Sequence, residues 1–600
     1  MKKLLAFFLL FCFFFLFPQK MHASDFLISG NATYTVQTSG MTHVEYDLTL
    51  TNATSQYFAS SYTLHTGVKN VQNLVASEKN VRMTPKISQA NGNAVVTVSF
   101  PQHVLGKNAV LPFIIAFDTP NIASLNGSLW EINIPGLTNT AHFSDFSVHV
   151  VVPSYFSEPL YIKPATTSAD LVFTKEQLGT GGISIAYGDK QVYTFNLQYT
   201  IQNTGFTQQT QDIALPPDTS YQEVSLAHIN PKPQNVTTDI DGNWLAQYQL
   251  NPGETKEITV SGKVFLALTP KQEQLTQEQF AQYTRQQPFW QSADPNIVSL
   301  AQKLRTIAAI YEYVVSHLSY DFARVSTNQQ RLGALGVLGK KTQAVCLEFT
   351  DLFIAISRAG GIPSREIDGY AYTQNTSQRP LLSGEEILHA WPEYYDMQAK
   401  KWIMVDPTWQ NTTGGVDYFH TFDLDHIAFV IHGASSTMPL PAGAYTLPGQ
   451  PSGSTIRIGF APESVTPNPT AQFSLAGASQ STAGFPMIVH LVIKNTGSVL
   501  FPTQKVIVQT ALGRGDQTIT TPVVPPFGTA SIAIPLPPTG FLTSAKDMVT
   551  IRVAGQTLTK VISVTPLSFI FIVLAGGGII AVFAYIISII ARKPRHLSIF

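Results

Sequence analysis

The stretch from Leu567 to Ala591 constrains this chain more than any other, because it contains no charged residue over a length that can cross a lipid bilayer. A helix in a bilayer satisfies its own backbone hydrogen bonds, so we expect a transmembrane helix here. Arg592, Lys593 and Arg595 follow the stretch directly. This excess of positive charge predicts a cytoplasmic C-terminal tail and an upstream chain that lies outside the cell.

A second apolar run, from Leu4 to Phe17, follows two lysines near the N-terminus. The small residues after it predict a secretory signal peptide that is cleaved near Ala23. An uncleaved anchor is the alternative, although the run is short for a membrane span. Cleavage would remove Cys12 and leave Cys346 as the one thiol, without a partner for an intramolecular disulfide. An exported protein of this size without disulfides is more typical of bacteria than of eukaryotes.

Length and composition limit the fold and the partners. A chain of 600 residues exceeds what one hydrophobic core usually organises, so several domains are expected. The formal net charge is −1 and 12% of the residues are charged, which argues against nucleic acid as a partner. Glycine and proline are frequent throughout, which suits a β-rich extracellular protein.

Alternating apolar residues predict β-sandwich units on both sides of the centre of the chain. Residues 25–156 hold short alternating runs and an Asn91-Gly92 hairpin signal. A second β-rich unit is expected at 157–268, where alternate positions from Tyr193 to Ile201 are apolar. Residues 456–565 return to this pattern, so we expect a third unit there, an Ig-like β-sandwich.

Several glycine-rich or acidic segments are better explained as turns than as ligand sites. Asp239 to Asn243 resembles the start of a calcium loop, but the twelfth position is Leu250 instead of a carboxylate. Gly179 to Gly182 lacks the Lys-Ser/Thr ending of a phosphate loop.

The segments Ile201–Gly205 and Ile493–Gly497 both end an alternating run with Asn-Thr-Gly, which predicts similar architecture at the two places.

The central region, 269–432, combines helix and strand signals. Its first part, up to residue 291, is polar and predicts a linker or a short helix. Asp294 and Pro295 then predict the start of a helix. The buried face of this helix is expected to consist of Ile297, Leu300, Leu304, Ile307, Tyr311, Val314 and Leu318.

A further helix is predicted to begin at or near Cys346. Apolar residues recur after it at spacings of three and four, and Gly360 and Gly361 provide a stop. At a helix N-terminus, free N–H groups and the helix dipole favour a thiolate. A lone cysteine on an apolar helix is nevertheless more often an inert core residue, and for Cys346 taken alone this is the favoured interpretation.

Two strands around a short turn are expected downstream, from His389 to Tyr395 and from Lys400 to Asp406. If the turn is Asp396 to Ala399, Tyr395 pairs with Lys400, and His389 then faces Asp406 on the same side of the pair. Such a carboxylate would fix the imidazole tautomer and leave the other nitrogen free for a thiol.

These segments resemble the transglutaminase-like superfamily over roughly Asp294 to His432. The resemblance implies a papain-like cysteine fold with Cys346 as nucleophile, His389 as base and acid, and Asp406 as the residue that orients the histidine. Many members carry glycine where this chain has Val345, which is expected to narrow access to the thiol. The resemblance is carried by Cys346-Leu347-Glu348-Phe349, Ala359 to Arg365, Gly369-Tyr370, His389-Ala390-Trp391-Pro392-Glu393 and Trp402 to Thr408.

Other side chains are weaker candidates. Gln343 is the one nearby candidate for a second oxyanion donor beside the Cys346 backbone N–H, or else a surface residue. Trp391 and Trp402, with Trp409, are expected to wall the cleft or to belong to the core. Arg365 and Asp368 are expected to form a structural ion pair.

Three histidines, His420, His426 and His432, recur with Asp423 and Asp425 nearby. Their spacing fits no metal site that we can name, so solvated or core histidines are the favoured interpretation. We expect no metal and no cofactor.

The sequence thus predicts a multidomain fold: N-terminal β-sandwich modules, a central α+β papain/transglutaminase-like domain, a C-terminal β-sandwich and one transmembrane helix. The predicted function is a single-pass plasma-membrane cysteine enzyme that acts outside the cell on protein or peptide amides through a thioester. The alternative is a non-catalytic surface scaffold or adhesion protein. The expected boundaries are 1–24 for the signal peptide, 25–156, 157–268, 269–432, a linker at 433–455, 456–565, 566–591 for the membrane helix and 592–600 for the tail.

Overall fold

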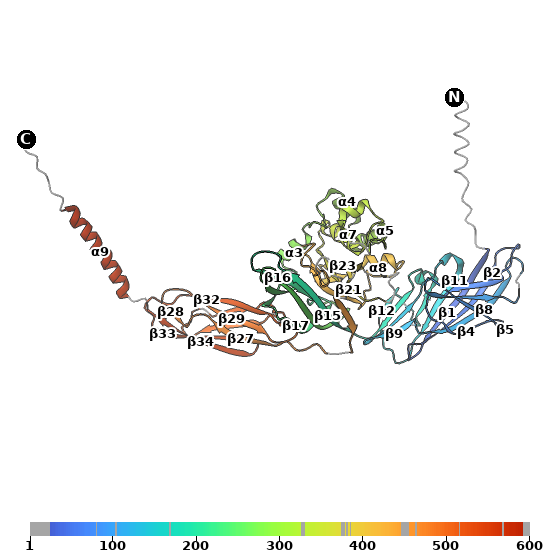
Figure 1. Cartoon of the computed structure of the whole chain (residues 1–600), viewed down its shortest axis with the longest axis horizontal. Coiled ribbons are helices and arrows are strands. Elements are labelled where there is room, and N and C mark those ends of the chain that lie inside the picture. Colours follow the sequence, from blue (N-terminus) through green and yellow to red (C-terminus); the bar gives the residue numbers. More distant parts are fainter. Residues whose placement is uncertain are drawn as a thin grey trace, which may run out of the picture.

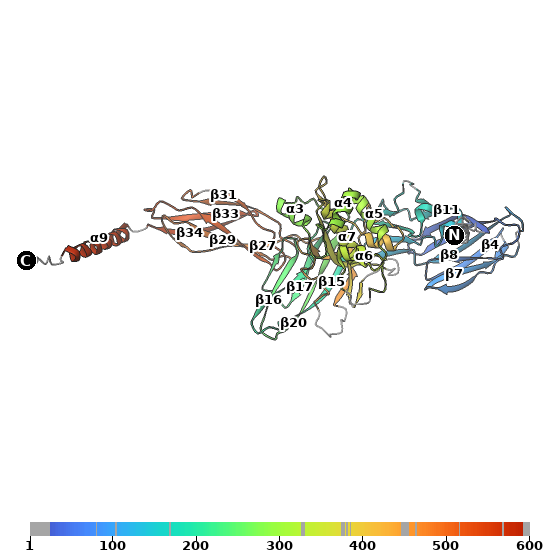
Figure 2. The ribbon, with the colours of Figure 1, turned by 90° about the horizontal axis from the view of Figure 1, so that it is seen from above.

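The computed structural model describes residues 25–591 except 80, 103–104, 167, 169, 326–329, 374–378, 380–381, 385, 446–454, 463–464, 515 and 567–568. The predicted signal peptide with Cys12 and the predicted tail at 592–600 lie outside the described residues. Figures 1 and 2 show the β-rich units in a row, with most helices gathered on one side of the central unit and a single helix at the C-terminal end.

The N-terminal unit consists of β1 (Phe26–Val36), β2 (Thr42–Asn52), β3 (Ser61–His65), β4 (Gln72–Glu78), β5 (Val81–Met83), β6 (Lys86–Ala90), β7 (Asn93–Ser99), β8 (Val110–Thr119), β9 (Ala123–Asn126), β10 (Leu129–Ile134), η1 (Thr140–His142), β11 (Phe143–Val151), β12 (Pro159–Lys163), β13 (Val172–Thr174), α2 (Lys175–Leu178) and β14 (Ile183–Tyr187). Its sheets have the orders β13-β11-β1-β2-β8-β4-β5, β12-β14-β10-β9 and β3-β7-β6, and they share one apolar core. Asn91 and Gly92 form the two-residue turn between β6 and β7 with φ of 51° and 77°, so this hairpin prediction is confirmed.

The expected boundary between residues 156 and 157 falls inside this N-terminal unit. Strands β12 and β14 pair with each other, and β14 also pairs with β10. Strand β13 pairs with β11. These pairings mean that the first unit extends to about residue 187. The sequence could not show this, because local alternation does not tell which sheet a strand joins.

The second unit consists of β15 (Gln191–Gln202), β16 (Gln209–Leu215), β17 (Gln222–Asn230), β18 (Asn235–Thr238), β19 (Trp244–Leu250) and β20 (Thr255–Leu266). Its sheets have the orders β17-β20-β15-β26 and β16-β19-β18. Strand β26 (Ile456–Phe460), expected in the C-terminal unit, pairs with β15 instead. Between β18 and β19, Asp239 accepts the N–H groups of Asp241 and Asn243 at 2.9 Å, which confirms a turn.

The two Asn-Thr-Gly segments have the same local structure. Asn203 and Asn495 are both buried, and each side-chain oxygen accepts the N–H of the glycine two residues later, at 2.9 Å for Gly205 and 2.8 Å for Gly497. Each amide nitrogen also donates to two backbone carbonyl groups. A buried asparagine thus ends a strand in both units, as the repeated pattern predicted.

The central unit consists of α3 (Gln277–Thr284), α4 (Pro295–Leu304), α5 (Ile307–His317), α6 (Gly333–Gly339), α7 (Cys346–Ala359), β21 (Ser364–Ala371), β22 (Leu382–Gly384), β23 (Glu386–Asp396), β24 (Lys401–Met404), α8 (Pro407–Thr412) and β25 (His426–His432). The sheet order is β22-β23-β21-β25, with β24 on β23. The single helix expected after Asp294 is two helices, because Arg305 has a left-handed φ of 62° and Thr306 caps α5.

The C-terminal unit consists of β27 (Ala471–Ala476), β28 (Gln480–Thr482), β29 (Met487–Asn495), β30 (Lys505–Thr510), β31 (Gln517–Thr520), β32 (Thr529–Leu536), β33 (Ala545–Val553) and β34 (Gln556–Thr565). Helix α9 (Phe569–Ala591) follows. Its segment Leu574–Ala591 has a mean hydropathy of 2.3 and is not buried against the protein, so it is long and apolar enough to cross a membrane. Of the expected linker at 433–455, the structure describes residues 433–445 and residue 455.

Candidate functional site

Cys346 is the first residue of α7, which confirms the predicted helix start. Its side chain is fully buried and receives a hydrogen bond from the backbone of Ala390 on β23. Thr350, one turn further along α7, donates to the carbonyl oxygen of Ala390 at 3.2 Å. These contacts hold the first turn of the helix against the strand that carries His389.

Glu348 fixes the turn that presents the thiol. Its Oε2 accepts the N–H of Val345 at 3.0 Å, and its Oε1 accepts the N–H of Leu332 at 2.9 Å. The guanidinium of Arg324 lies 3.3 Å from the same carboxylate. A glutamate at the third helical position that reaches back to the N-cap residue is a known helix-start arrangement. The Glu348 carboxylate therefore holds the N–H of Val345, the residue before Cys346, and is itself held by Leu332 and Arg324.

His389 and Asp406 form a buried pair. Nε2 of His389 lies 2.9 Å from Oδ2 of Asp406. The other carboxylate oxygen, Oδ1, accepts the N–H groups of Thr408 and Trp409 at 2.9 and 3.0 Å, so Asp406 also caps α8. The carboxylate accepts from Nε2, and Nδ1 of His389 is buried without a hydrogen-bond partner among the residues that the structure describes. Nδ1 is thus left to accept a proton.

The pairing of β23 with β24 differs from the predicted register by two residues. Glu393 pairs with Met404 instead of Trp402, and the turn is the four residues between Asp396 and Lys401. Strand β24 ends at Met404, and the chain bends so that Asp406 reaches His389 from the start of α8. The predicted contact therefore forms, but through a helix cap instead of a strand pair.

Burial dominates the electrostatics of the site. It raises the pKa of the Cys346 thiol well above the ordinary value, which is opposite to the shift expected from a helix N-terminus alone. It also lowers the pKa of His389, although Asp406 acts in the other direction. Burial alone would raise the pKa of Asp406, but His389 and His426 outweigh it and hold that pKa below its usual range. The resting state at neutral pH is a thiol beside a neutral imidazole and an ionised carboxylate.

Aromatic rings surround His389. Trp391 and Trp409 stack on it with ring centroids at 6.0 and 5.1 Å. Trp402, expected as a second wall, lies further along the strand, where the guanidinium of Arg365 packs 4.0 Å from its ring centroid. The register shift moves Trp402 away from His389. Since the whole centre is buried, a substrate reaches the thiol only after neighbouring residues move.

The other predicted residues have separate positions. Gln343 is exposed, and its role as an oxyanion donor stays a prediction. Arg365 pairs with Glu393 at 2.7 Å, not with Asp368. Residues three apart in a strand point to opposite faces, so the expected Arg365–Asp368 pair is wrong. Asp368 lies 3.6 Å from Nδ1 of His432.

The three histidines belong to three networks and form no common metal site. His420 is exposed beside Asp417. His426 lies between Asp406 and Asp423, whereas His432 contacts Glu366 and Asp368.

Within the part of the chain that the structure describes, two groups place three ligand-type atoms within 4.8 Å of one another: His389 with Asp406 and His426, and Glu366 with Asp368 and His432. Hydrogen bonds and ion pairs between protein groups explain the contacts in the first. The guanidinium of Arg331 contacts Glu366 in the second and disfavours a cation there.

Sequence reasoning missed the residues that support the pair. Glu348 had a usable signal, because a glutamate three positions after an N-cap predicts a reciprocal helix cap. His426 and Asp423 were weighed as metal ligands or as core or solvated residues, without a role beside His389. Lys163 had no signal, since it lies on β12 of the N-terminal unit and reaches the central unit only in the folded protein.

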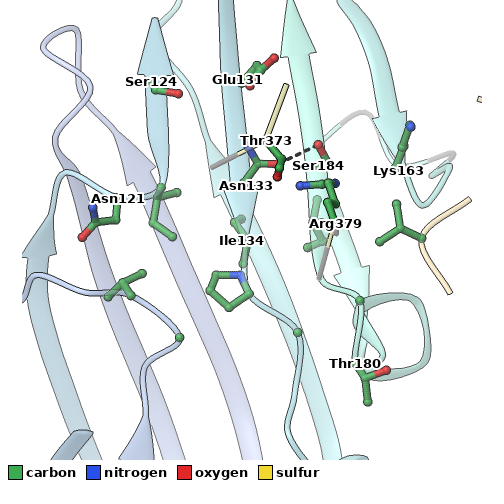
Figure 3. A pocket seen from close by; sticks show the side chains of 18 of the residues that line it. Asn121, Ser124, Glu131, Asn133, Ile134, Lys163, Thr180, Ser184, Thr373 and Arg379 are labelled. Atoms are coloured by element: carbon green, nitrogen blue, oxygen red, sulfur yellow. Dashed lines mark hydrogen bonds between the residues drawn. The ribbon is translucent and has the colours of Figure 1, made fainter. Parts of the chain in front are cut away.

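A cavity of about 680 Å³ lies between the N-terminal and central units. Figure 3 shows Glu131, Lys163 and Ser184 from the N-terminal unit and Arg379 from the central unit around this hollow. Asp423 and Tyr418 also line it. Its wall therefore includes Asp423, which contacts His426, and His426 in turn lies against Asp406.

Comparisons with known proteins identify the central unit. Residues 293–407 match the family model of the transglutaminase-like superfamily. This segment includes Cys346, His389 and Asp406. No curated protein matches the chain.

Among solved structures, a proposed cysteine protease from Cytophaga hutchinsonii is similar at 18% identity and a TM-score of 0.28, covering 46% of this chain and 98% of its own. The transglutaminase of red sea bream is similar at 10% identity and a TM-score of 0.18, covering 87% of this chain and 80% of its own. Both likenesses are distant, so the assignment rests on the family match at 293–407.

Proposed function

We propose that this protein, whose residues 293–407 form a transglutaminase-like domain, is a membrane-anchored cysteine enzyme that acts on protein or peptide amides outside the cell. The buried hydrogen bond of 2.9 Å between His389 and Asp406 carries the proposal. The next residue on the same strand, Ala390, contacts Cys346. A thiol, an imidazole and an orienting carboxylate are the groups that nucleophilic acyl transfer needs.

In the first half of the reaction Nδ1 of His389 takes the proton from Cys346 as the sulfur attacks the amide carbonyl carbon. The backbone N–H of Cys346, at the start of α7, is the proposed donor to the oxyanion. The C–N bond then breaks, the amine leaves with the proton from His389, and the acyl group stays on sulfur as a thioester. Asp406 holds the imidazole so that the same nitrogen performs both transfers.

In the second half an acceptor attacks the thioester carbonyl carbon while His389 removes its proton. The C–S bond then breaks, and the sulfur takes the proton back from His389 to restore the Cys346 thiol. Water as acceptor gives hydrolysis or deamidation, and a lysine-type amine gives a cross-link. Burial of the centre supports exclusion of bulk water until a substrate binds. We favour amide hydrolysis or acyl transfer on cell-surface proteins. Both reactions proceed through the same Cys346 thioester.

The test uses the full-length protein in detergent and a glutamine-containing peptide, with ammonia release measured in the presence and absence of a labelled primary amine. We expect ammonia release that is lost in Cys346→Ala, and the label shows how the thioester divides between water and amine. If turnover is absent, or survives the Cys346→Ala substitution, the alternative of a non-catalytic surface scaffold is favoured.

A further inference from the structure

A buried line of ionisable side chains, in which bases and acids alternate, runs from His389 to Lys163 of the N-terminal unit. Asp406 Oδ2, 2.9 Å from Nε2 of His389, also lies 3.5 Å from Nε2 of His426. The other ring nitrogen of His426 lies 2.7 Å from Oδ1 of Asp423. The second oxygen of Asp423 lies 3.8 Å from Nζ of Lys163. Two histidines thus share one carboxylate, and the far end of the line belongs to another unit.

Each member of the line is nearly inaccessible to solvent. The exposed fractions are 0–3% for the side chains from His389 to Lys163. Nζ of Lys163 also lies 3.5 Å from the ring centroid of Tyr418, which adds a cation–π contact. Charges removed from water in this way need their partners, because loss of one leaves its neighbour uncompensated. The position of each charged side chain in the line therefore depends on the neighbouring side chain.

We propose that Lys163, Asp423 and His426 are positioning residues for the catalytic pair, so that the N-terminal unit completes the active site of the central unit. This inference rests on the proposed function. His426 meets Oδ2 of Asp406, the oxygen that His389 also meets, while Oδ1 is occupied by the start of α8. The hydrogen bond with His389 and the contact with His426 at Oδ2, together with the helix cap at Oδ1, oppose rotation of the carboxylate away from the imidazole.

The charges along the line compensate one another. His426 places a nitrogen near each of two carboxylates, Asp406 and Asp423, and these carboxylates raise its pKa although burial opposes them. With His426 as a cation, the two carboxylates are balanced by His426 and Lys163. Among the residues that the structure describes, the other charged or titratable groups around Lys163 and Asp423 include Glu131, Asp425, Arg379, Asp417, Tyr418, Tyr161 and Tyr193.

Lys163 lines the cavity between the two units, in which Figure 3 shows its side chain. Truncation of this side chain would open the space of an alkylamine beside Asp423. A small ammonium ion that enters from the cavity would then supply the missing charge. This gives a test that separates the charge at this position from a general effect on folding.

The experiment measures the rate at which iodoacetamide alkylates Cys346 in the full-length protein, read by mass spectrometry of the Cys346 peptide. We expect Lys163→Met to react between about tenfold and 100-fold more slowly, because small misplacements of catalytic groups have effects of this size. Lys163→Arg should retain most of the rate, and added ethylammonium should restore it in Lys163→Ala. Asp423→Asn, which keeps the volume but not the charge, should show the same loss as Lys163→Met.

Lys175→Met is the matched control, since Lys175 is in the same unit and donates to the carbonyl oxygen of Phe143. The inference is overturned if Lys163→Met reacts like this control, or if neither Lys163→Arg nor ethylammonium restores the rate. The proposed function fails instead if the wild-type protein shows no Cys346-dependent ammonia release from a glutamine-containing peptide, so the two failures are distinguishable.

Discussion

At Asp406 one carboxylate has two tasks, and they involve different oxygens. Oδ1 caps α8 and Oδ2 faces His389. The geometry therefore separates the contribution of Asp406 to folding from its contribution to chemistry. An asparagine at this position would keep its oxygen at the helix cap, where only an acceptor fits, and would turn its NH₂ group towards Nε2 of His389.

We predict that Asp406→Asn keeps the α8 cap but loses activity. It should also unfold at a lower temperature than the wild type, because the buried His426 cation loses one of its two carboxylates. The NH₂ group would donate to Nε2, so the proton of the neutral imidazole would move to Nδ1 and block removal of the thiol proton. A wrong tautomer of this kind lowers kcat by up to about 10⁴-fold. Thermal unfolding and turnover should be measured side by side, with Asp417→Asn as control because Asp417 caps a turn and contacts exposed His420. Equal activity in the two variants would contradict the assigned role.

At the scale of elements, a network of ion pairs joins α7, β21 and β25 behind the site. Arg331 bridges Asp351 of α7 and Glu366 of β21. His432 of β25 contacts Glu366 at 3.3 Å through Nδ1 and the carbonyl oxygen of Pro439 at 2.7 Å through Nε2. A histidine with an acceptor at both nitrogens is favoured as a cation.

This network predicts a stability that depends on pH. Burial lowers the pKa of His432, but the hydrogen bond that its ring donates to Glu366 and the charges of Asp368 and Glu366 outweigh it and raise that pKa from 6.5 to about 9. A folded-state pKa above the unfolded value means that the stabilisation is complete below about 6.5 and is lost as the pH rises through about 9. The melting temperature of His432→Gln should therefore fall less between these pH values than that of the wild type.

His420→Gln is the control for this measurement, because His420 is exposed and lies outside this network. It should retain the wild-type dependence. Parallel curves for His432→Gln and wild type would show that His432 is neutral in the folded protein.

The elements also show what the sequence could predict. The start of α7 at Cys346, the Asn91-Gly92 turn and the Asn-Thr-Gly strand ends follow from local chemistry and were predicted correctly. The register of β23 and β24 was wrong by two residues, because it depends on where the turn begins. The contact between His389 and Asp406 was still anticipated, since the motif fixes which residues meet but not by which route.

At the scale of the whole molecule, the β-rich units form a row that ends in α9, and the second unit includes β26 from far along the chain (Figure 1). Pairings of this kind, and the contact of Lys163 with Asp423, join residues that no local pattern connects. The unit boundaries near residues 156 and 456 were misplaced for that reason. A proposed membrane anchor in α9 would hold the row of units at the cell surface.

We predict that a charge in the middle of α9 releases the protein from the membrane. Ile580→Arg would cost about 2.5–3.5 kcal/mol for insertion of the helix. The fraction that stays with the membrane after alkaline carbonate extraction should fall. Val465→Arg is the control, because Val465 is 85% exposed outside α9. An unchanged membrane fraction for Ile580→Arg would mean that α9 is not the anchor.

The measurement that tests the central claim most directly is the intact mass of the protein after brief exposure to an activated acyl ester, followed by mapping of the modified peptide. The account predicts one acyl group on Cys346, formed rapidly by the wild type, much more slowly by His389→Ala, and not at that site by Cys346→Ala. An acyl group on other residues, or equal acylation of Cys346 with and without His389, would contradict it.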